Sequence, residues 1–381
     1  MRKLAIDLTY QPTGGSIPQI TEIINNIDYY DFDSVIFYIT KDNLNFFKDS
    51  NNKKITLNSV RFSNKSIIFR TIWAQIVLPI LLVIDNIDVL FCPGNISPII
   101  NSRKKVQWIG TIGPFEKDFI SFFSIKNRII LFFTKYLMIF SSYTSDMVIF
   151  ESNYTRELFF KKYKQKLKKS SVIHIGNNSF YKPVSIFSSK IIKDINECDF
   201  ILTVSHLYPY KNLEVLIKSF YDLKLRDRGM KILIAGSKSD KKYYKKIQDM
   251  INQYEISDSI IFLGNVKKED LRELYSKCKI FVFTSPYENF AYTLVEAMSC
   301  GAPIVASNTT AMPETCDNAA LYFSPDSFEE LSKCILTFLN DEETRRRYKE
   351  MSLIKSNSYD LYSEVNIKTS LLIKKYLIIN K

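Results

Sequence analysis

The sequence predicts an α/β fold made of two doubly wound, Rossmann-like domains that face a central cleft. First, apolar β-rich runs alternate with helix-like segments, the pattern that parallel sheets produce. Second, 381 residues exceed what one hydrophobic core usually organises, and a polar stretch over 177–198 interrupts the alternation. We therefore expect a first domain over 1–176, a linker over 177–198 and a second domain over 199–358.

Six apolar runs of the first domain are typical of strands: Lys3–Leu8, Ser34–Ile39, Val89–Phe91, Val106–Thr111, Met147–Phe150 and Val172–Ile175. The first run is short and contains Asp7, so it predicts a strand rather than a signal peptide. The most apolar run, Ile72–Ile84, is too short for a bilayer, which needs about 20 residues. It predicts a buried helix that is broken or kinked at Pro79.

The second domain begins with the strand Phe200–Val204 and contains a further apolar run, Lys279–Phe283. Loop Ser285–Ala291 follows that run, then a helix predicted to start near 291–293, and then the strand Ile304–Ser307. The last segment, 359–381, is helix-like.

Composition narrows the class of protein. Hydrophobic residues make up 46% and charged residues 24% of the chain, which is ordinary for a globular protein. The six cysteines are scattered without a C-x-x-C pair, so we expect reduced thiols in a cytoplasmic protein. The two histidines, His174 and His206, cannot make a zinc site at any usual spacing.

Two glutamates, Glu288 and Glu296, mark the segment with the clearest ligand-binding pattern. Ligands of open parallel sheets bind beyond the carboxyl ends of the strands, where the loop with Glu288 is expected. The helix that follows presents unpaired N–H groups and a positive dipole end, which suits a phosphate. Glu296 lies about one turn further in, where it can accept hydrogen bonds from hydroxyl groups. Taken alone, the two acids are more typical of a turn residue and an ordinary helix glutamate.

The segment from Glu288 to Ser307 resembles the E-x7-E region of the retaining GT-B glycosyltransferases known as group 1. Three further blocks are similar to that family and occur in the family's order: Ser205–Leu213, Ile232–Ser237 and Phe262–Val266. Together the four blocks span about residues 200–325. The resemblance implies the GT-B fold, with the C-terminal helix over 359–381 crossing back to pack on the first domain.

The resemblance also implies roles for individual residues. Glu288 would orient the hydroxyls of the donor sugar, Lys211 would reach the donor diphosphate, and these two are the expected catalytic residues. Glu296 would hold the ribose, and His206 stands where the family has an arginine that binds phosphate. The other expected donor-binding residues are Asn289, Phe290, Ala291, Tyr292, Thr293 and the turn glycines Gly14 and Gly15. The glycines alone also fit a plain tight turn.

Two features concern the mechanism. Many family members carry a His-Asp pair after the strand that matches Val106–Thr111, whereas Gly110–Glu116 contains no histidine. The resemblance implies a same-face substitution in which the leaving diphosphate accepts the proton of the acceptor.

The triplet Asp31–Asp33 has the D-x-D form that binds a metal in the GT-A fold, but its place between a helix and a strand predicts a solvated turn. We expect no metal and no other cofactor, since the nucleotide sugar is a substrate.

The net charge of +12 includes two basic runs, Arg103–Lys105 and Lys161–Lys169. Together with apolar residues such as Phe122, Phe132 and Phe133, they suggest that the first domain touches an anionic membrane on its inner, cytoplasmic face. A solvated lysine-rich helix explains the charge equally well. No recognition motif accompanies the charge, so we do not expect nucleic acid as a partner.

These observations predict a retaining, metal-independent glycosyltransferase of the hexosyltransferase type. It would move a sugar from a nucleotide-sugar donor to a saccharide acceptor, expected to be lipid-linked, in cell-surface polysaccharide biosynthesis. A nucleotide-sugar epimerase on the GT-B fold is one alternative. A non-catalytic sugar-binding or scaffold protein at the membrane is another, motivated by the missing arginine and histidine and opposed by the presence of Glu288, Glu296 and Lys211.

Overall fold

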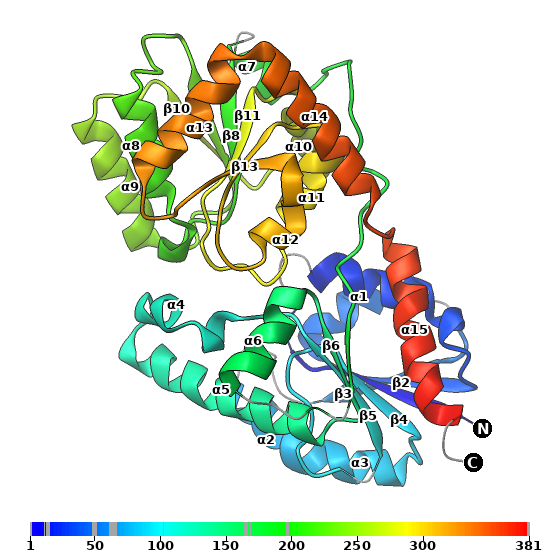
Figure 1. The fold of residues 1–381 in the computed structure, drawn as a ribbon. Coiled ribbons are helices and arrows are strands. Elements are labelled where there is room, and N and C mark those ends of the chain that lie inside the picture. The colour runs from blue at the N-terminus through cyan, green and yellow to red at the C-terminus, as the bar shows by residue number, and fades with distance from the viewer. Residues whose placement is uncertain are drawn as a thin grey trace. The chain divides into compact units, whose positions relative to one another are not determined.

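The computed structural model describes residues 2–378 except 11, 13–15, 48–51, 61–66, 102, 164–166, 168 and 196–197. The chain divides into two compact units (Figure 1). Unit 1 contains Met1–Gly176 and Asp360–Lys381, and unit 2 contains Asn177–Tyr359. Each unit is an α/β layer structure with helices on both faces of one parallel sheet, as the sequence predicts.

Within its described residues, unit 1 has a seven-stranded sheet in the order β3-β2-β1-β4-β5-β6-β7. The strands are β1 (Lys3–Leu8), β2 (Ser34–Thr40), β3 (Ile55–Val60), β4 (Val89–Cys92), β5 (Lys104–Ile109), β6 (Met147–Phe150) and β7 (Ser170–Val172). β7 precedes its predicted position, and β3 was not predicted. β3 is an edge strand whose polar Thr56, Asn58 and Ser59 dilute the apolar signal.

The helices of unit 1 that bear on function are α1 (Ser16–Asn25), α2 (Ile67–Ile72), α3 (Leu78–Ile84), α4 (Lys117–Ser121), α5 (Ile125–Thr144), α6 (Asn153–Tyr163) and α15 (Tyr362–Ile378). The segment Ile72–Ile84 is helical, as predicted, but it is buried along one side only. A π-helical turn, Trp73–Val77, separates α2 from α3, and Pro79 lies in the first turn of α3, where its missing N–H costs nothing. Trp73, Leu78 and Leu82 are buried, but Ile76, Ile80 and Ile84 are 59%, 56% and 66% exposed.

The C-terminal helix α15 packs on unit 1. Val365 and Ile373 belong to the same buried cluster as Ile20 and Ile23 of α1. The hydroxyl of Tyr30 donates to Asn366 Oδ1 at 2.6 Å, and Asn366 Nδ2 donates to the Glu22 carbonyl at 3.1 Å. The apolar contact and the polar pairs together fix where this helix lies.

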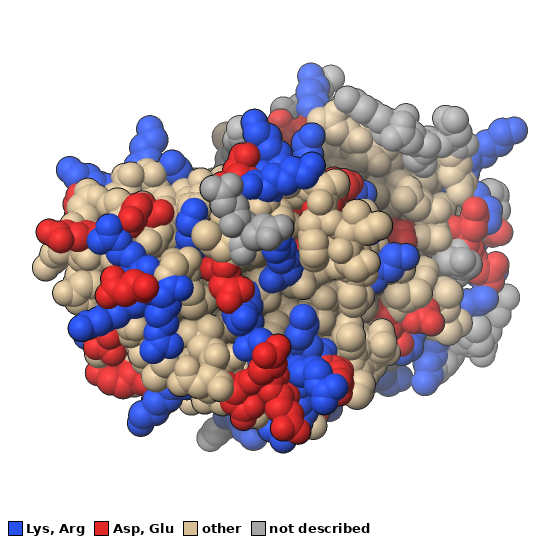
Figure 2. Space-filling view, turned by 90° about the horizontal axis from the view of Figure 1, so that it is seen from above, with Lys and Arg blue, Asp and Glu red and all other residues tan. Residues whose placement is uncertain are grey.

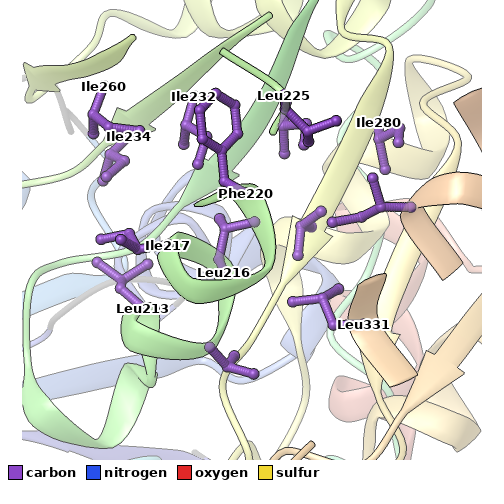
Figure 3. Packing of buried hydrophobic residues seen from close by; sticks show 14 of the residues in the cluster. Leu213, Leu216, Ile217, Phe220, Leu225, Ile232, Ile234, Ile260, Ile280 and Leu331 are labelled. Atoms are coloured by element: carbon purple, nitrogen blue, oxygen red, sulfur yellow. The ribbon is translucent and has the colours of Figure 1, made fainter. Parts of the chain in front are cut away.

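Unit 2 has, in the part of the chain that is described, a six-stranded sheet in the order β10-β9-β8-β11-β12-β13. The strands are β8 (Phe200–Val204), β9 (Lys231–Ala235), β10 (Ile260–Gly264), β11 (Ile280–Phe283), β12 (Ile304–Ser307) and β13 (Ala320–Phe323). Its helices include α7 (Lys190–Asp194), α8 (Leu213–Asp222), α9 (Lys241–Gln253), α10 (Lys268–Lys277), α11 (Tyr292–Ser299), α12 (Met312–Cys316), α13 (Phe328–Asn340) and α14 (Glu342–Asn357). Leu216 and Phe220 of α8 pack against Ile232 and Ile280 of the sheet in a fully buried cluster (Figure 3).

The segment 177–198, which we expected to be a linker, lies within unit 2. The buried Glu273 carboxylate of α10 accepts hydrogen bonds from Ser188 N, Ser188 Oγ and Ser189 N, each at 2.8 Å. Two backbone N–H groups and one serine hydroxyl of this segment therefore satisfy a buried acid of unit 2.

No helix among the described residues is both long and apolar enough to cross a lipid bilayer.

Gly236, directly after β9, is a position that only glycine fits. Its φ is +145°, and a Cβ atom there would overlap the Ser205 carbonyl oxygen after β8. Gly229 has φ +71° with nothing within 4 Å of a Cβ atom, so it is a matched control. We predict that Gly229→Ala lowers the free energy of unfolding by about 1–2 kcal/mol. Gly236→Ala should cost about 1–3 kcal/mol more, because backbone atoms must move apart.

The free energy of unfolding of both variants is measured by urea titration, with far-UV circular dichroism as the signal. Equal losses of stability for the two variants would contradict the close backbone approach at Gly236.

Candidate active site

The candidate site lies where the loops after β8 and β11 come together. The two strands are parallel neighbours, with Ile280 opposite Ile201 and Phe281 opposite Leu202. β8 also pairs with β9 on its other side, so the strand order reverses next to β8. Such a switch point is where open α/β sheets bind ligands, because the adjacent loops leave the sheet in opposite directions.

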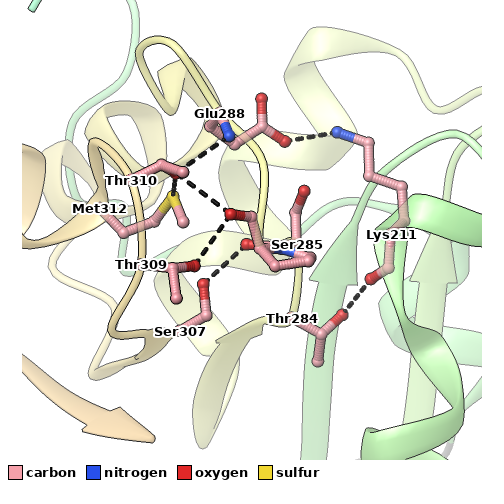
Figure 4. A network of polar contacts seen from close by, with 9 residues as sticks. Lys211, Thr284, Ser285, Glu288, Ser307, Thr309, Thr310 and Met312 are labelled. Atoms are coloured by element: carbon pink, nitrogen blue, oxygen red, sulfur yellow. Dashed lines mark hydrogen bonds and ion pairs between the residues drawn. The ribbon is translucent and has the colours of Figure 1, made fainter. Parts of the chain in front are cut away.

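Lys211 and Glu288 form an ion pair at this point. Lys211 Nζ lies 2.5 Å from Glu288 Oε1, and the side chains are 16% and 19% exposed (Figure 4). Lys211 ends a short 3-10 turn after β8, and its carbonyl accepts a hydrogen bond from Thr284 Oγ1 at 2.6 Å. The ammonium also lies 5.2 Å from the centre of the Tyr210 ring. The cation is therefore fixed at its backbone and at its charged end.

A set of hydroxyl groups holds the loop that carries Glu288. The Glu288 N–H donates to Thr310 Oγ1 at 3.2 Å. Thr310 Oγ1 and Thr309 Oγ1 donate to the Pro286 carbonyl at 3.2 and 2.9 Å (Figure 4). Thr310 has φ +49°, an unusual backbone conformation for a β-branched residue. Strained residues of this kind concentrate at functional sites, where the surrounding contacts enforce them.

Two buried hydroxyl oxygens at the same edge of the sheet lack a partner among the described residues. They are Ser205 Oγ, directly after β8, and Ser285 Oγ, after β11. Ser285 is only 2% exposed. A buried hydroxyl without a hydrogen bond is costly, so a polar ligand at this edge would relieve the cost.

Glu296 lies in the second turn of α11, half-buried. The Tyr275 hydroxyl donates to Glu296 Oε2 at 3.2 Å, and the Tyr181 hydroxyl lies near the same carboxylate. Burial raises the pKa of Glu296 to about 7, although both phenol hydrogen bonds act to lower it. Burial thus sets the pKa of Glu296 apart from that of an exposed glutamate.

The residues between the two acids are mostly buried. Asn289, Phe290 and Ala291 are 8%, 6% and 2% exposed, and the Phe290 ring packs edge-on against Tyr359 with centroids 5.6 Å apart. Tyr292 and Thr293 are half-buried at the start of α11. The Tyr292 N–H donates to the Phe290 carbonyl and the Leu294 N–H to the Ala291 carbonyl, each at 3.0 Å. We expected these N–H groups to be unpaired, and the local turn bonds instead occupy two of them.

His206 is exposed beside this edge. Its Nδ1 accepts from the Ser237 N–H at 3.1 Å and lies 2.7 Å from Ser237 Oγ. Loss of solvent around the ring and the nearby Lys211 ammonium hold the pKa of His206 below its usual value. The ring is therefore neutral at pH 7, and the hydrogen bonds assign its proton to Nε2. It offers one donor to an anion, fewer than an arginine would.

Gly14 and Gly15 lie outside the described residues. The D-x-D triplet is occupied by ion pairs, since Asp31 lies 2.5 Å from Lys374 Nζ and 3.6 Å from Arg2 Nη2. Among the described residues, no group of three His, Cys, Asp or Glu side chains is placed to hold a metal ion.

In unit 1, the structure reveals an acid that the sequence reasoning missed. Glu151, directly after β6, is 6% exposed and accepts a hydrogen bond from Trp108 Nε1 at 2.8 Å. Its carboxylate occupies the space beside Gly110, where a Cβ atom would lie 2.5 Å from Oε1. Gly110 starts the loop that lacks the family's histidine. The available signal was an acid at the carboxyl end of a fully buried strand.

The raised pKa of Glu296 makes stability depend on pH. Since its pKa rises from the usual 4.5 to about 7, the folded chain binds more protons than the unfolded chain between these values. Stability from this group is therefore lost as pH rises from about 4.5 to 7. We predict that Glu296→Gln raises Tm relative to wild type by a few degrees more at pH 8 than at pH 5.

The exposed Glu343→Gln is the matched control. Thermal unfolding of wild type and both variants is measured at pH 5 and pH 8. A change in Tm on Glu296→Gln that is the same at both pH values would contradict the raised pKa of Glu296.

Comparison with known proteins agrees with this geometry. Residues 187–352 match the model of the family described as glycosyl transferases group 1. The serotype-specific mannosyltransferase WbdA of Escherichia coli is 31% identical over 162 residues, which are 42% of this chain and 20% of that protein. The O-antigen chain mannosyltransferase B of Escherichia coli is 32% identical over 151 residues, 38% of each protein. The chain thus spans well under half the length of these relatives.

The fold of the whole chain is also found among solved structures. The structure of Anabaena HepE in complex with UDP superposes with a TM-score of 0.75 at 16% identity, covering 98% of this chain and 100% of that chain. At this identity the likeness concerns the fold. Residues 187–352 are thus similar to the glycosyl transferases group 1, and the two Rossmann-like units have the GT-B fold.

Proposed function

We propose that this protein is a retaining glycosyltransferase. It moves a hexose from a nucleotide-sugar donor to a saccharide acceptor in the assembly of a cell-surface polysaccharide. The observation that carries the proposal is the Lys211–Glu288 pair at the switch point of the unit 2 sheet, beside the unpartnered hydroxyls of Ser205 and Ser285. The mannosyltransferase names of the relatives and the UDP bound to HepE support a nucleotide sugar as donor.

In this proposal, Lys211 provides the positive charge that the donor diphosphate needs. Its ammonium carries three N–H donors, and Glu288 takes one of them in the structure. The neutral His206 adds one N–H donor from the neighbouring loop. Charge build-up on the leaving diphosphate is therefore met by fixed donors, and the reaction requires no metal ion.

Glu288 and Glu296 orient the rest of the donor. Glu288 accepts hydrogen bonds from sugar hydroxyls while it stays close to Lys211, and Glu296 accepts them from the ribose. The bond between the anomeric carbon and the diphosphate oxygen breaks, and the acceptor hydroxyl oxygen bonds to that carbon on the same face. Its proton passes to the leaving diphosphate. The protein contributes position and charge rather than a covalent intermediate.

A lipid-linked acceptor at the cytoplasmic face of an anionic membrane is the second part of the proposal. Helix α5 exposes apolar side chains along its length, namely Ile125, Ile129, Phe132, Phe133, Tyr136, Phe140 and Tyr143, each between 41% and 76% exposed. The exposed bases Lys126 and Arg128 lie on the same helix. Apolar side chains interspersed with bases are typical of helices that lie in the membrane interface.

The basic run Arg103–Lys105 does not form the exposed, membrane-facing charge that we expected from the sequence. Lys105 is 2% exposed and donates inward to the Pro98 carbonyl and to Thr144 Oγ1, and Lys104 pairs with Asp146 at 3.7 Å. In the run Lys161–Lys169, residues 164–166 and 168 lie outside the described residues, and Lys161 pairs with Glu157 at 2.6 Å.

Nucleic acid is not part of the proposal. On the face of the molecule in Figure 2, lysine and arginine side chains alternate with aspartate and glutamate. A nucleic-acid site would need bases gathered into one surface.

The donor site is tested by thermal shift with UDP, GDP, ADP, CMP and dTDP, with and without magnesium. We predict that at least one nucleotide raises Tm of the wild type, equally in both conditions, because it binds only the folded chain. Lys211→Ala should fold but lose this shift in Tm. Lys218, whose ammonium lies over the Phe328 ring, is the control, and Lys218→Ala should keep the shift.

Sugar transfer from the matching nucleotide sugar should be lost in both Lys211→Ala and Glu288→Ala. Full turnover in these variants would reject the site. A nucleotide sugar that changes configuration without any acceptor would favour the epimerase, and no binding of any nucleotide would favour a non-catalytic protein.

The membrane part is tested by sedimentation with vesicles of phosphatidylethanolamine and phosphatidylglycerol. The double variant Phe132→Ser, Phe133→Ser should bind about tenfold or more weakly, since each ring loses apolar burial. The matched control is Tyr221→Ser, which removes an aromatic residue of unit 2 that is 49% exposed. Failure of the wild type to sediment, or equal binding of the double variant, would refute membrane docking through α5.

A further inference from the structure

Tyr181 reaches the candidate site from a part of the chain that the motifs do not cover. It lies in segment 177–189 and is 9% exposed. Its ring stands edge-on to Tyr275 of α10, with centroids 6.0 Å apart and planes at 70°. Tyr275 donates to Glu296 Oε2 at 3.2 Å, and the Tyr181 hydroxyl lies near the same carboxylate, where it acts to lower the pKa of Glu296.

The segment that carries Tyr181 is fastened to the same helix as Glu296. Ser299 Oγ donates to Asn177 Oδ1 at 3.0 Å, and Asn177 Nδ2 donates to the Ser356 carbonyl of α14 at 3.3 Å. Glu296 and Ser299 are three positions apart in α11, so both face the segment.

A second attachment holds the residue before Tyr181. Arg272 of α10 lies 4.6 Å from the centre of the Phe180 ring and donates to the Phe180 carbonyl at 3.4 Å. The contacts at Asn177 and Phe180, both just before Tyr181, thus restrict where its phenol points.

The two phenols suit a carboxylate that must stay available to a ligand. Burial raises the pKa of both Tyr181 and Tyr275, so each remains a protonated donor at neutral pH. The third titratable group near Glu296 is Cys300, whose pKa burial raises to about 12. A carboxylate has about four acceptor positions, so two phenol donors fix its orientation and leave others for the hydroxyls of a ligand.

We infer that Tyr181 is a positioning residue that orients the Glu296 carboxylate for the ribose hydroxyls of the nucleotide donor. The inference rests on the proposed function for the identity of the ligand. The orientation itself rests on contacts within unit 2. Because the phenol is uncharged, it holds the carboxylate without competing as a counter-ion for the phosphates.

The first test needs no ligand. The titration of Glu296 is followed by NMR of protein labelled with carbon-13 at the glutamate carboxyls, and Glu296→Gln assigns the signal. In Tyr181→Phe the midpoint should move to higher pH than in wild type, because a hydrogen bond to the charged form is lost. Tyr221→Phe, which removes an exposed hydroxyl elsewhere in unit 2, should leave the midpoint unchanged. An unchanged midpoint in Tyr181→Phe would overturn the inference.

The second test asks what the orientation serves. Binding of UDP, GDP and ADP is measured at pH 7.5 beside their 2′,3′-dideoxy forms. Tyr181→Phe should weaken binding of the ribose form by about two- to tenfold and leave the dideoxy form unaffected. Equal weakening of both forms would show a merely structural role and overturn the inference. If none of the three binds to wild type, the proposed donor site fails for these nucleotides, and the NMR titration still decides whether Tyr181 orients Glu296.

Discussion

The parallel pairing of β8 with β11 is the constraint on which the candidate site depends. These strands are far apart in the sequence, yet their pairing brings Lys211 and Glu288 close enough to form an ion pair. Gly236 makes a related contribution, since its missing side chain lets the end of β9 approach Ser205 and His206. The buried apolar residues of unit 2 fix this sheet, and the loops then receive their positions from it.

Hydroxyl groups hold the loops at the positions of Lys211 and Glu288. Thr284 fixes the backbone of Lys211, while Thr309 and Thr310 fix the turn before Glu288. Hydrogen bonds of this kind are directional, so they define where a charged side chain points more sharply than apolar contacts can. The Lys211–Glu288 pair therefore has a set position in the absence of ligand, which is the property that a preorganised charge site requires.

The sequence was informative where local pattern decides the structure. Strand β1, the α/β class and the start of α11 follow from apolar runs and turn residues, whereas Lys211 and Glu288 were expected from the resemblance to the group 1 family. Contacts between distant segments could not be predicted in this way. Tyr181 and Thr310 have ordinary sequence surroundings, and their partners are set by packing. The exposed face of α3 was missed because apolar residues signal burial only on average.

The most direct test of the account is a crystal structure of the protein with its intact nucleotide-sugar donor. We predict a diphosphate oxygen within hydrogen-bond distance of Lys211 Nζ and a sugar hydroxyl donating to Glu288. We also predict ribose hydroxyls at Glu296. A donor bound with its diphosphate away from Lys211, and with the Lys211–Glu288 pair unchanged, would contradict the account.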